Sequence, residues 1–497
     1  MIEKTALITI YSIVIFAAIC IGYGIYLARR LRGSSDFLAA SKALPWYAVA
    51  MGVALSPLGS GHTIGMWETG YLAGLMAVWF SICFGALFMP WCFYGLGSWI
   101  RRTGAISIPE TFHLFYGPLG RKLSILPNWG FSFCIAGIEI LCISYAIYGI
   151  TGLPLIPWCI VISTILSIIY VEFAGLRQLG YLNVIFALIM YIGAYLGLAW
   201  LGAYALPSQL GITWEGITQR LTEMGQAFKL NMFASPEIIS TIAIPMVIFA
   251  LFGCGSVQMP MQAAFGAKDI KEVRKALPSA AFVNSLSTIP WAAIGLITVV
   301  TAFAAAGPSI GPINLMVTLL PAEIVAALLI SLLVANISTS AGHILATTIV
   351  STNDIYKGFI NPNADEKTQL RLSRILVIIY SIIGGLIAYM LAAAQALIIP
   401  NLMWTSALAL PGFFLALYGF WWKRSKKAFT LSWLIIWIVV TVWTFIPRSI
   451  LLQYVPAWLA EPLNFSAILS FIVVTALTAA LPGEKGYFKS QGVVKNA

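Results

Sequence analysis

A run of small residues in a long apolar segment has the spacing of an oxygen-lined cation site. Ala335, Ser338, Thr339 and Gly342 fall at i, i+3, i+4 and i+7, and therefore share one face of a helix. Ser338 and Thr339 present neighbouring hydroxyls, and the Ala335 carbonyl can join them. Hydroxyl and carbonyl oxygens suit a hard cation such as Na⁺. The alternative is that these hydroxyls bond carbonyls of their own helix, and the spacing alone slightly favours that interpretation.

A second stretch, Ala54 to Gly65 (ALSPLGSGHTIG), interrupts an apolar segment at 46–75 that is long enough to cross a membrane. Pro57 removes an amide donor, and the glycines weaken the helix further. Unpaired backbone groups are costly in lipid, so such a break persists only where protein or a water-filled cavity covers it. We interpret the break as a binding site; a kinked packing face of small residues is the alternative.

A comparable break lies at 249–262 (FALFGCGSVQMPMQ), where Gly, Ser, Gln and Pro interrupt another apolar helix. Two interrupted helices at matching places in two halves of a chain predict an inverted-repeat transporter. In such a fold both breaks lie near the bilayer midplane, and the half-helix ends offer amides and carbonyls to a solute and a cation. A broken helix that lends carbonyls makes the cation site the favoured interpretation of Ser338 and Thr339.

Ionisable residues inside apolar segments are candidates for solute contact. Glu139 lies mid-span without a basic partner in its helix, and a charge at that depth is a functional hypothesis by default. It could bind an ammonium group, carry a proton, or be protonated and merely packed. His62 follows the first break and is favoured as a solute contact over an interhelical hydrogen bond. Glu68 is expected at the interface, outside the pocket.

The composition defines the class of protein. Of 497 residues, 60% are hydrophobic and 9% charged, against about 25% charged in soluble domains, which indicates a polytopic membrane protein. The basic residues behind the net charge of +11 lie between the apolar runs, where signals for membrane orientation are found. We therefore expect no nucleic-acid partner. The seven cysteines lie in apolar segments without metal-ligand spacing. No nucleophile, phosphate loop or metal cluster is recognisable, so we expect no enzyme.

Thirteen candidate membrane spans can be counted. They lie near 5–28, 46–75, 76–99, 123–150, 153–173, 179–204, 236–262, 277–305, 323–355, 372–394, 396–422, 429–447 and 462–481. With the N-terminus outside, 24 of the 28 basic residues fall in inner loops, which predicts a cell-membrane protein with a cytoplasmic C-terminus. The segment Ser107 to Phe112 is expected to form a short amphipathic helix on the cytoplasmic surface, with no chemistry assigned to it.

Several motifs resemble the sodium:solute symporter family. They are SSDFLAASKALPWYAVAMG (34–52), GSGH (59–62), IPETF (108–112), AGLR (174–177), Gln262 with AKD (267–269), and ISTSAGHILATTIVSTNDIYK (337–357). The resemblance covers roughly residues 34–427. It implies an all-α fold with a five-plus-five inverted-repeat, leucine-transporter-like core, one leading helix and two trailing helices. The expected divisions are 1–45 for the leading helix and its loop, 46–204 and 205–422 for the repeats, and 423–497 for the trailing helices.

The resemblance also implies a sodium site. Its ligands would be the backbone carbonyls of Leu55, Leu58 and Ala335 with the hydroxyls of Ser338 and Thr339. Some members have a second site that uses an Asp in core helix 5 and two further hydroxyls. The corresponding positions here are Asn183, Ala341 and Gly342, so we predict no second site and one Na⁺ per cycle.

Departures from the family concern the solute. Sugar-carrying members place an Asn before the first break and bulky aromatics at the second, where this chain has Pro57, Gly253 and Cys254. A sugar is therefore not expected; few buried basic residues weakly favour a zwitterionic or cationic solute. The predicted solute contacts are Ser56, Gly59, Ser60, His62, Glu139, Cys254, Ser256, Gln258, Asn401 and Trp404, of which Asn401 and Trp404 would cap the pocket from outside.

The predicted function is sodium-driven import of a small polar organic solute, such as an amino acid, amine or vitamin, by alternating access. The alternatives are a proton-coupled or uncoupled carrier of the same fold, suggested by Glu139 and Asn183, and a solute sensor, which the short tail after Leu481 disfavours. The expected partners are the solute, Na⁺ and the bilayer, without an organic cofactor. The oligomeric state is left open, with a monomer acceptable.

Overall fold

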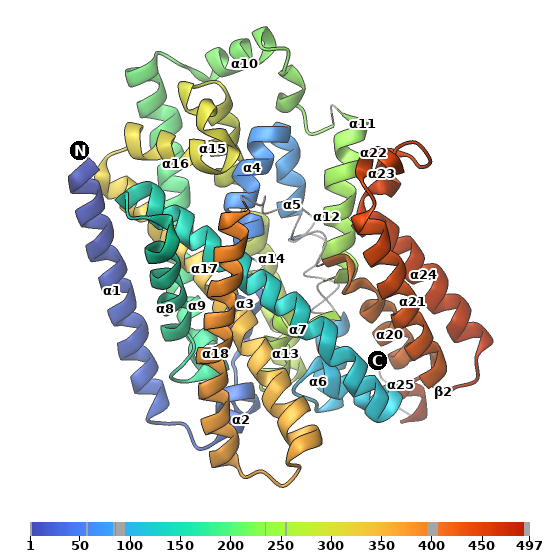
Figure 1. The fold of residues 1–497 in the computed structure, drawn as a ribbon. Helices are drawn as coiled ribbons and strands as arrows, with labels where there is room; N and C mark the ends of the chain where they lie inside the picture. The colour runs from blue at the N-terminus through green and yellow to red at the C-terminus, as the bar shows by residue number, and fades with distance from the viewer. Residues whose placement is uncertain are drawn as a thin grey trace.

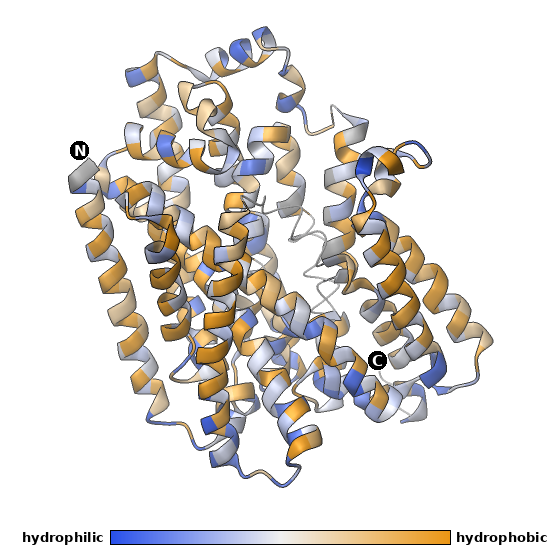
Figure 2. Ribbon diagram, viewed as in Figure 1, coloured by the Kyte–Doolittle hydropathy of each residue, from blue (hydrophilic) through white to orange (hydrophobic). Residues whose placement is uncertain are grey.

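The chain folds into a bundle of helices, with one short strand pair. The computed structural model describes residues 2–55, 58–82, 85, 95–233, 235–253, 256–394 and 406–491. The strands β1 (Lys423–Arg424) and β2 (Glu484–Lys485) pair antiparallel, with Lys423 opposite Lys485. Hydrophobic residues occupy the middle of the long helices and hydrophilic residues collect toward their ends (Figure 2), as expected for helices that cross a bilayer.

The first half of the chain contains the interrupted helix and the long helix that crosses it (Figure 1). Its elements are α1 (Ile2–Ala28), α2 (Ser34–Ala39), η1 (Ala40–Lys42), α3 (Trp46–Leu55), η2 (Ser60–His62), α4 (Ile64–Ala73), η3 (Gly74–Val78), α5 (Trp79–Ile82), α6 (Ser98–Thr103), α7 (Ile108–Thr151), η6 (Leu155–Cys159), α8 (Ile160–Ile169), α9 (Gly175–Trp200) and η7 (Leu201–Leu210).

The second half contains the other interrupted helix and the most buried helix. Its elements are α10 (Trp214–Glu223), η8 (Ala227–Leu230), α11 (Pro236–Ile238), η9 (Ile239–Ala243), α12 (Ile244–Ile248), η10 (Phe249–Gly253), α13 (Gln258–Gly266), α14 (Ile270–Ser285), α15 (Ile289–Val299), η12 (Ala302–Ala306), α16 (Gly307–Leu319), α17 (Ala322–Ile349), η13 (Val350–Ile360), α18 (Glu366–Ala393) and α20 (Leu410–Trp421). After β1 follow α21 (Lys426–Phe445), α22 (Arg448–Leu451), α23 (Ala457–Ala460), α24 (Pro462–Ala480) and α25 (Tyr487–Ser490).

Among the described residues, nine helices are long and apolar enough to cross a membrane, and three shorter apolar helices accompany them. Two of the spans expected from the sequence are interrupted in the structure. The segment 46–75 is absent from the nine because its break leaves only the ten-residue helices α3 and α4. The segment expected at 277–305 corresponds to one of the nine, Ile270–Val299, which consists of α14 and α15. The total of thirteen spans stays a prediction.

The short helix expected at 107–112 is present, with Pro109 in its first turn, and a kink at Gly117 (φ 73°) joins it to the rest of α7. The expectation that it lies on a surface was wrong. Ile108, Pro109 and Phe112 are buried there, because they pack under neighbouring helices. The region between the spans expected at 277–305 and 323–355 also contains α16, which was not predicted because its start is rich in Gly and Pro.

The core lies around α17, which packs against α7 and α9, whereas α1 is largely exposed at the outer edge of the bundle (Figure 1). Close helix packing relies on small residues, as is common in membranes. An added Cβ at Gly70 of α4 would lie 2.2 Å from the Ala292 carbonyl oxygen, and one at Gly295 of α15 would lie 2.0 Å from that of Trp67. These two glycines let α15 pack closely against α4, the second half of the interrupted helix.

Candidate functional site

Four oxygens converge where α3 ends. The Leu55 carbonyl accepts hydrogen bonds from Thr339 Oγ1 at 3.2 Å and Ser338 Oγ at 3.5 Å, both on α17. The same hydroxyls also lie 3.1 and 2.9 Å from the Ala335 carbonyl oxygen, one helical turn earlier. The two interpretations of the hydroxyls are thus both present in the geometry: each side chain contacts its own helix and the end of the broken one. Leu58 is buried beside them and donates its N–H to Leu55 at 3.0 Å.

This oxygen cluster has the chemistry of a monovalent cation site. It consists of two carbonyl and two hydroxyl oxygens, all neutral, at the C-terminal end of a half-helix, where the helix dipole is negative. The described residues contain no group of three or more His, Cys, Asp or Glu side chains arranged to hold a metal ion. Leu55, Ala335, Ser338 and Thr339 are all nearly inaccessible to solvent, and a partly dehydrated Na⁺ fits a buried cluster of neutral oxygens.

Side chains from other helices satisfy the backbone groups that the break releases. Asn284 of α14 donates to the Ala54 carbonyl at 2.6 Å. Asn336 of α17 donates to Thr63 Oγ1 at 3.1 Å, and that hydroxyl in turn lies 3.0 Å from the Gly59 carbonyl oxygen. An unpaired backbone group in a dry interior is costly, so these contacts allow the interruption to persist.

The most specific contact at the break is made by Glu139 of α7. Its carboxylate accepts the Ser60 N–H and the Ser60 hydroxyl, each at 2.7 Å, one on each oxygen. Glu139 is only 2% exposed. Gly59 is required at this crossing, because a Cβ there would lie 2.3 Å from both carboxylate oxygens. The predicted solute contacts Gly59, Ser60 and Glu139 are therefore brought together.

The two other polar residues of the first broken helix are also buried. His62, at the end of η2, is 1% exposed, two residues from Ser60. Glu68 is 3% exposed and accepts a hydrogen bond from the Ser309 hydroxyl of α16 at 2.6 Å. The expectation that Glu68 is interfacial was therefore wrong, since α16, a helix that the sequence analysis did not anticipate, covers it.

At the second break, Ser256 and Gln258 make different contacts. The Ser256 hydroxyl donates to the carbonyls of Gly253 and Ala409, at 2.9 and 2.8 Å. Gln258 is placed beside the start of α7: its N–H donates to Asn128 Oδ1 at 2.7 Å, and its side-chain oxygen accepts the Ile108 N–H at 2.7 Å. Its side-chain nitrogen donates to the carbonyl of residue 106 at 3.2 Å.

Gln258 is therefore not brought together with Ser60. Asn128, which it contacts, precedes Glu139 by eleven residues on α7, a distance of about 16 Å along a helix. Four further predicted solute contacts, Ser56, Cys254, Asn401 and Trp404, lie outside the described residues, as does Pro57.

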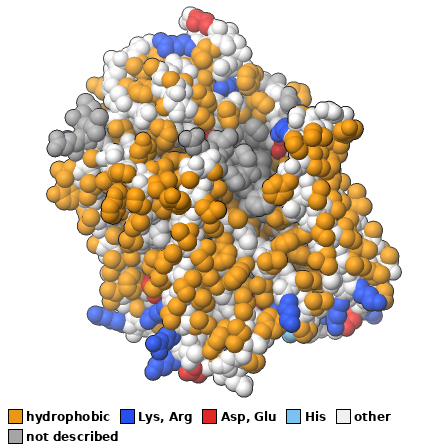
Figure 3. Space-filling model, viewed as in Figure 1, with side chains coloured by type: hydrophobic (Ala, Val, Ile, Leu, Met, Phe, Trp, Pro, Cys, Tyr) orange, Lys and Arg blue, Asp and Glu red, His pale blue; other side chains and the backbone are white. Residues whose placement is uncertain are grey.

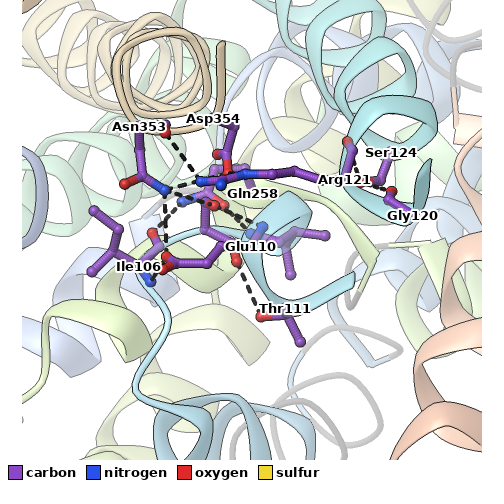
Figure 4. A network of polar contacts seen from close by, with 11 residues as sticks. Ile106, Glu110, Thr111, Gly120, Arg121, Ser124, Gln258, Asn353 and Asp354 are labelled. Atoms are coloured by element: carbon purple, nitrogen blue, oxygen red, sulfur yellow. Dashed lines mark hydrogen bonds and ion pairs between the residues drawn. The ribbon is translucent and has the colours of Figure 1, made fainter. Parts of the chain in front are cut away.

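A polar network around the start of α7 was missed from the sequence. Arg121 Nε lies 2.7 Å from Asp354 Oδ1, and its Nη2 donates to the Asn353 carbonyl at 3.0 Å. The Asn353 side chain reaches Glu110 Oε2 at 3.3 Å, and Ser107 caps α7 by accepting the Glu110 N–H at 3.0 Å. Figure 4 shows these groups converging beside Gln258. The Ser107-x-x-Glu110 spacing, a capping-box signature, was the available signal.

The residues at the positions of a second cation site have other partners. Asn183 accepts the Tyr170 hydroxyl at 2.9 Å and lies 3.5 Å from the Met51 carbonyl oxygen. The Gly342 carbonyl accepts the Gln262 side-chain amide at 3.1 Å. The absence of a second sodium site stays a prediction.

Interrupted membrane helices around a buried set of neutral oxygens define a secondary transporter fold. The model of the sodium:solute symporter family matches residues 37–436, and the chain belongs to this family. It is a multi-pass membrane transporter and not an enzyme.

Two relatives match at the same level of identity. The sodium/glucose cotransporter of Vibrio parahaemolyticus is 25% identical over 494 residues, covering 90% of this chain and 86% of the relative. The sodium/proline symporter of Haemophilus influenzae (strain ATCC 51907 / DSM 11121 / KW20 / Rd) is 25% identical over 415 residues, covering 76% of each.

Solved structures share the fold. A substrate-bound, outward-open Na⁺-coupled sialic acid symporter aligns with a TM-score of 0.77 at 17% identity, covering 96% of this chain and 99% of that one. MhsT in complex with L-phenylalanine aligns with a TM-score of 0.51 at 16% identity, covering 88% of this chain and 99% of that one. These similarities describe the architecture alone.

Proposed function

We propose that this chain imports a small polar organic solute, such as an amino acid, an amine or a vitamin, driven by one Na⁺ per cycle through alternating access. The observation that carries the proposal is the convergence of the Leu55 and Ala335 carbonyls with the Ser338 and Thr339 hydroxyls. In the proposed site these four oxygens and the Leu58 carbonyl bind Na⁺. Inward movement of one charge through ~100 mV supplies about 2.3 kcal/mol, before any sodium gradient.

The solute side of the proposal rests on Glu139. Its carboxylate lies at the break and accepts two hydrogen bonds from Ser60, and His62 lies two residues further along the chain. An ionisable group inside a membrane helix is a functional hypothesis by default, and in its ionised form this carboxylate would attract a solute with a positive group. Gly59, Ser60, His62, Glu139 and Ser256 are the proposed contacts among the described residues, together with Ser56, Cys254, Asn401 and Trp404 outside them. Gln258, whose polar atoms contact the start of α7, is assigned to positioning α13.

Homology does not choose the solute. The glucose and proline carriers are each 25% identical to this chain, over 90% and 76% of it. Pro57, Gly253 and Cys254 stand where sugar-carrying members have an Asn and bulky aromatics, so the chain lacks groups that hydrogen-bond and stack against a sugar. We therefore favour an amino-acid-like, amine or vitamin-like solute over a sugar.

The proposed architecture has two inverted repeats, at 46–204 and 205–422, preceded by one helix and followed by two. The two interrupted helices, α3–α4 and the α11–α13 segment, support this division. In the proposed orientation the C-terminus is cytoplasmic. On the face drawn in Figure 3, basic side chains collect along the lower edge, where the positive-inside rule puts the cytoplasm.

A proton-coupled carrier is the second candidate, and Glu139 is the observation that favours it. Uptake into proteoliposomes distinguishes the two candidates. Solutes are first chosen by the thermal stabilisation that they give the purified protein in Na⁺ against K⁺. We expect accumulation with an inward Na⁺ gradient, and its loss in a Ser338→Ala, Thr339→Ala variant. Accumulation that ignores Na⁺ and this variant, but follows an imposed pH gradient, would establish the proton-coupled carrier instead.

A further inference from the structure

A basic cavity opens where α1 ends, far along the chain from the sodium cluster. Its volume is about 580 Å³, and it is formed by the turn after α1, by α2, η1 and the first residues of α9. The polar residues that line it are Arg29, Arg30, Arg32, Asp36, Ser41 and Arg177. The lining thus includes four arginines and one carboxylate, so the cavity has a net positive charge.

The single carboxylate in the cavity already accepts hydrogen bonds from other groups of the protein. Asp36 is 5% exposed and accepts hydrogen bonds from the Ser41 hydroxyl at 2.6 Å, the Arg32 N–H at 2.8 Å and Arg177 Nη2 at 2.9 Å. Among the described residues, no carboxylate forms an ion pair with the side chains of Arg29, Arg30 or Arg32. Three guanidinium groups therefore remain to bind an anion from outside.

The position of the cavity selects the kind of anion. Arg29 follows directly on the apolar helix α1, and only 22% of the apolar window of α1 is buried inside the protein. Ile19, Ile25 and Tyr26, on the last turns of α1, are exposed to the bilayer, and Arg30 stacks on the Tyr26 ring at 4.4 Å. An acyl chain can lie along this face while its headgroup reaches the arginines. Basic pockets at the ends of membrane helices bind phosphate-bearing headgroups in this way.

We propose that this cavity binds the phosphate of an anionic phospholipid headgroup, with its acyl chains along α1. The planar guanidinium groups of Arg29, Arg30 and Arg32 suit the paired oxygens of a phosphate diester. The site adjoins the turn Ala40–Lys42, whose three residues all have positive φ (47°, 49° and 54°) and lead into the broken helix through Trp46. A bound headgroup would therefore contact the segment that leads into α3, on the cytoplasmic side in the proposed orientation.

The test uses the full-length protein in detergent and native mass spectrometry, with phosphatidylglycerol, cardiolipin, phosphatidylcholine and inorganic phosphate as separate probes. We expect the two anionic lipids to stay bound and phosphatidylcholine to dissociate. The Arg29→Gln, Arg30→Gln, Arg32→Gln variant should lose affinity by roughly fivefold for each arginine removed. The matched control is Lys426→Gln, Lys427→Gln, Lys489→Gln, which removes three exposed charges outside the cavity and should retain the lipid.

A second variant separates lipid binding from membrane insertion, because the same arginines are orientation signals. Replacing Arg29, Arg30 and Arg32 by Lys keeps the charge but removes the paired donors, and should weaken retention of the anionic lipids. The orientation of the protein in the membrane should not change, because the charge is kept. Equal retention by wild type and the Gln variant, or equal retention of phosphatidylcholine, would overturn the proposal. Displacement of the lipid by millimolar inorganic phosphate would assign the cavity to a soluble anion and likewise overturn it.

Discussion

Glu139 and Ser60, 79 residues apart in the chain, form two hydrogen bonds of 2.7 Å at the interruption of the first core helix. The carboxylate accepts both the backbone N–H and the hydroxyl, so it holds the first residue of η2, the short helix that precedes α4. Ser60 and Leu55 flank the same short break, so the proposed solute side and the proposed sodium side are five residues apart in the chain.

Gly59 should not tolerate a side chain. A Cβ there would meet both Glu139 oxygens at 2.3 Å, so Gly59→Ala should destabilise the protein by about 1–3 kcal/mol and abolish uptake. Thermal unfolding of the purified protein measures the first effect. Gly22→Ala is the control, because a Cβ at Gly22 in α1 meets nothing within 4 Å. Adding Glu139→Asp, whose shorter side chain withdraws the carboxylate, should restore part of the stability; no restoration would contradict the clash.

Removing the charge of Glu139 should impair solute binding more than removing the hydroxyl of Ser60. Glu139→Gln has one acceptor oxygen for two Ser60 donors, so one buried donor loses its partner, at a cost of about 1–3 kcal/mol. It also removes the charge that we assign to an amine. Ser60→Ala keeps that charge and the backbone contact. Uptake and solute-induced thermal shifts compare the two variants, and equal retention of solute binding in both would contradict a role for the charge.

Some of this site could be predicted from the sequence, and some could not. The i, i+3, i+4 spacing places Ser338 and Thr339 with Ala335 on one face of a helix, and Pro57 and the glycines predict the interruption, because both signals are local. The Glu139–Ser60 contact depends on how α7 crosses α3 and α4, and no periodicity encodes that crossing. Gln258 shows the converse: its position beside a break suggested a solute contact, but tertiary packing pairs it with the start of α7.

The fold shows the same division between local and distant signals. Long uninterrupted spans such as α1, α18, α21 and α24 were predicted within a few residues of their observed bounds, because a run of apolar residues suffices. The short helix at the start of α7 was predicted but its burial was not, because the packing of other helices over Ile108, Pro109 and Phe112 leaves no local signal. Helix α16 was missed because Gly307, Pro308 and Pro312 obscure its apolar pattern.

The ion pair between Arg121 and Asp354 should respond asymmetrically to mutation. The Asp354 side chain is fully buried, whereas that of Arg121 is 14% exposed. Arg121→Ala leaves a buried carboxylate without its charge partner and should cost about 3 kcal/mol. Asp354→Asn keeps the shape and leaves an arginine that can reach solvent, so it should cost less. Thermal unfolding at neutral pH ranks the two, and the reverse order would contradict this account of the network.

Asp36 should make stability depend on pH in the acid range. Burial alone would raise the pKa of this carboxyl, but the hydrogen bonds from Ser41 and the Arg32 N–H, with the charge of Arg177, hold the pKa below its ordinary value of 3.8. A group with a lowered folded pKa stabilises the fold above its unfolded pKa and loses that contribution as pH falls through the folded pKa. Wild type should therefore exceed Asp36→Asn in melting temperature at pH 6, and the difference should shrink below pH 4. A difference that is constant with pH would contradict the assignment to this carboxylate.

Thr339 offers the sharpest test of the proposed sodium site, because α17 carries a matched control. Thr339→Val keeps the shape but removes the hydroxyl that contacts both Leu55 and Ala335, whereas Thr348→Val removes one that contacts only the Ile344 carbonyl of its own helix. If Na⁺ binds at Thr339, a tenfold weaker affinity removes about 1.4 kcal/mol of the stabilisation that saturating Na⁺ provides. The shift in melting temperature between Na⁺ and K⁺ should therefore fall in Thr339→Val and persist in Thr348→Val. An equal Na⁺-dependent shift in both variants would remove Thr339 from the site and leave the Leu55 cluster as packing alone.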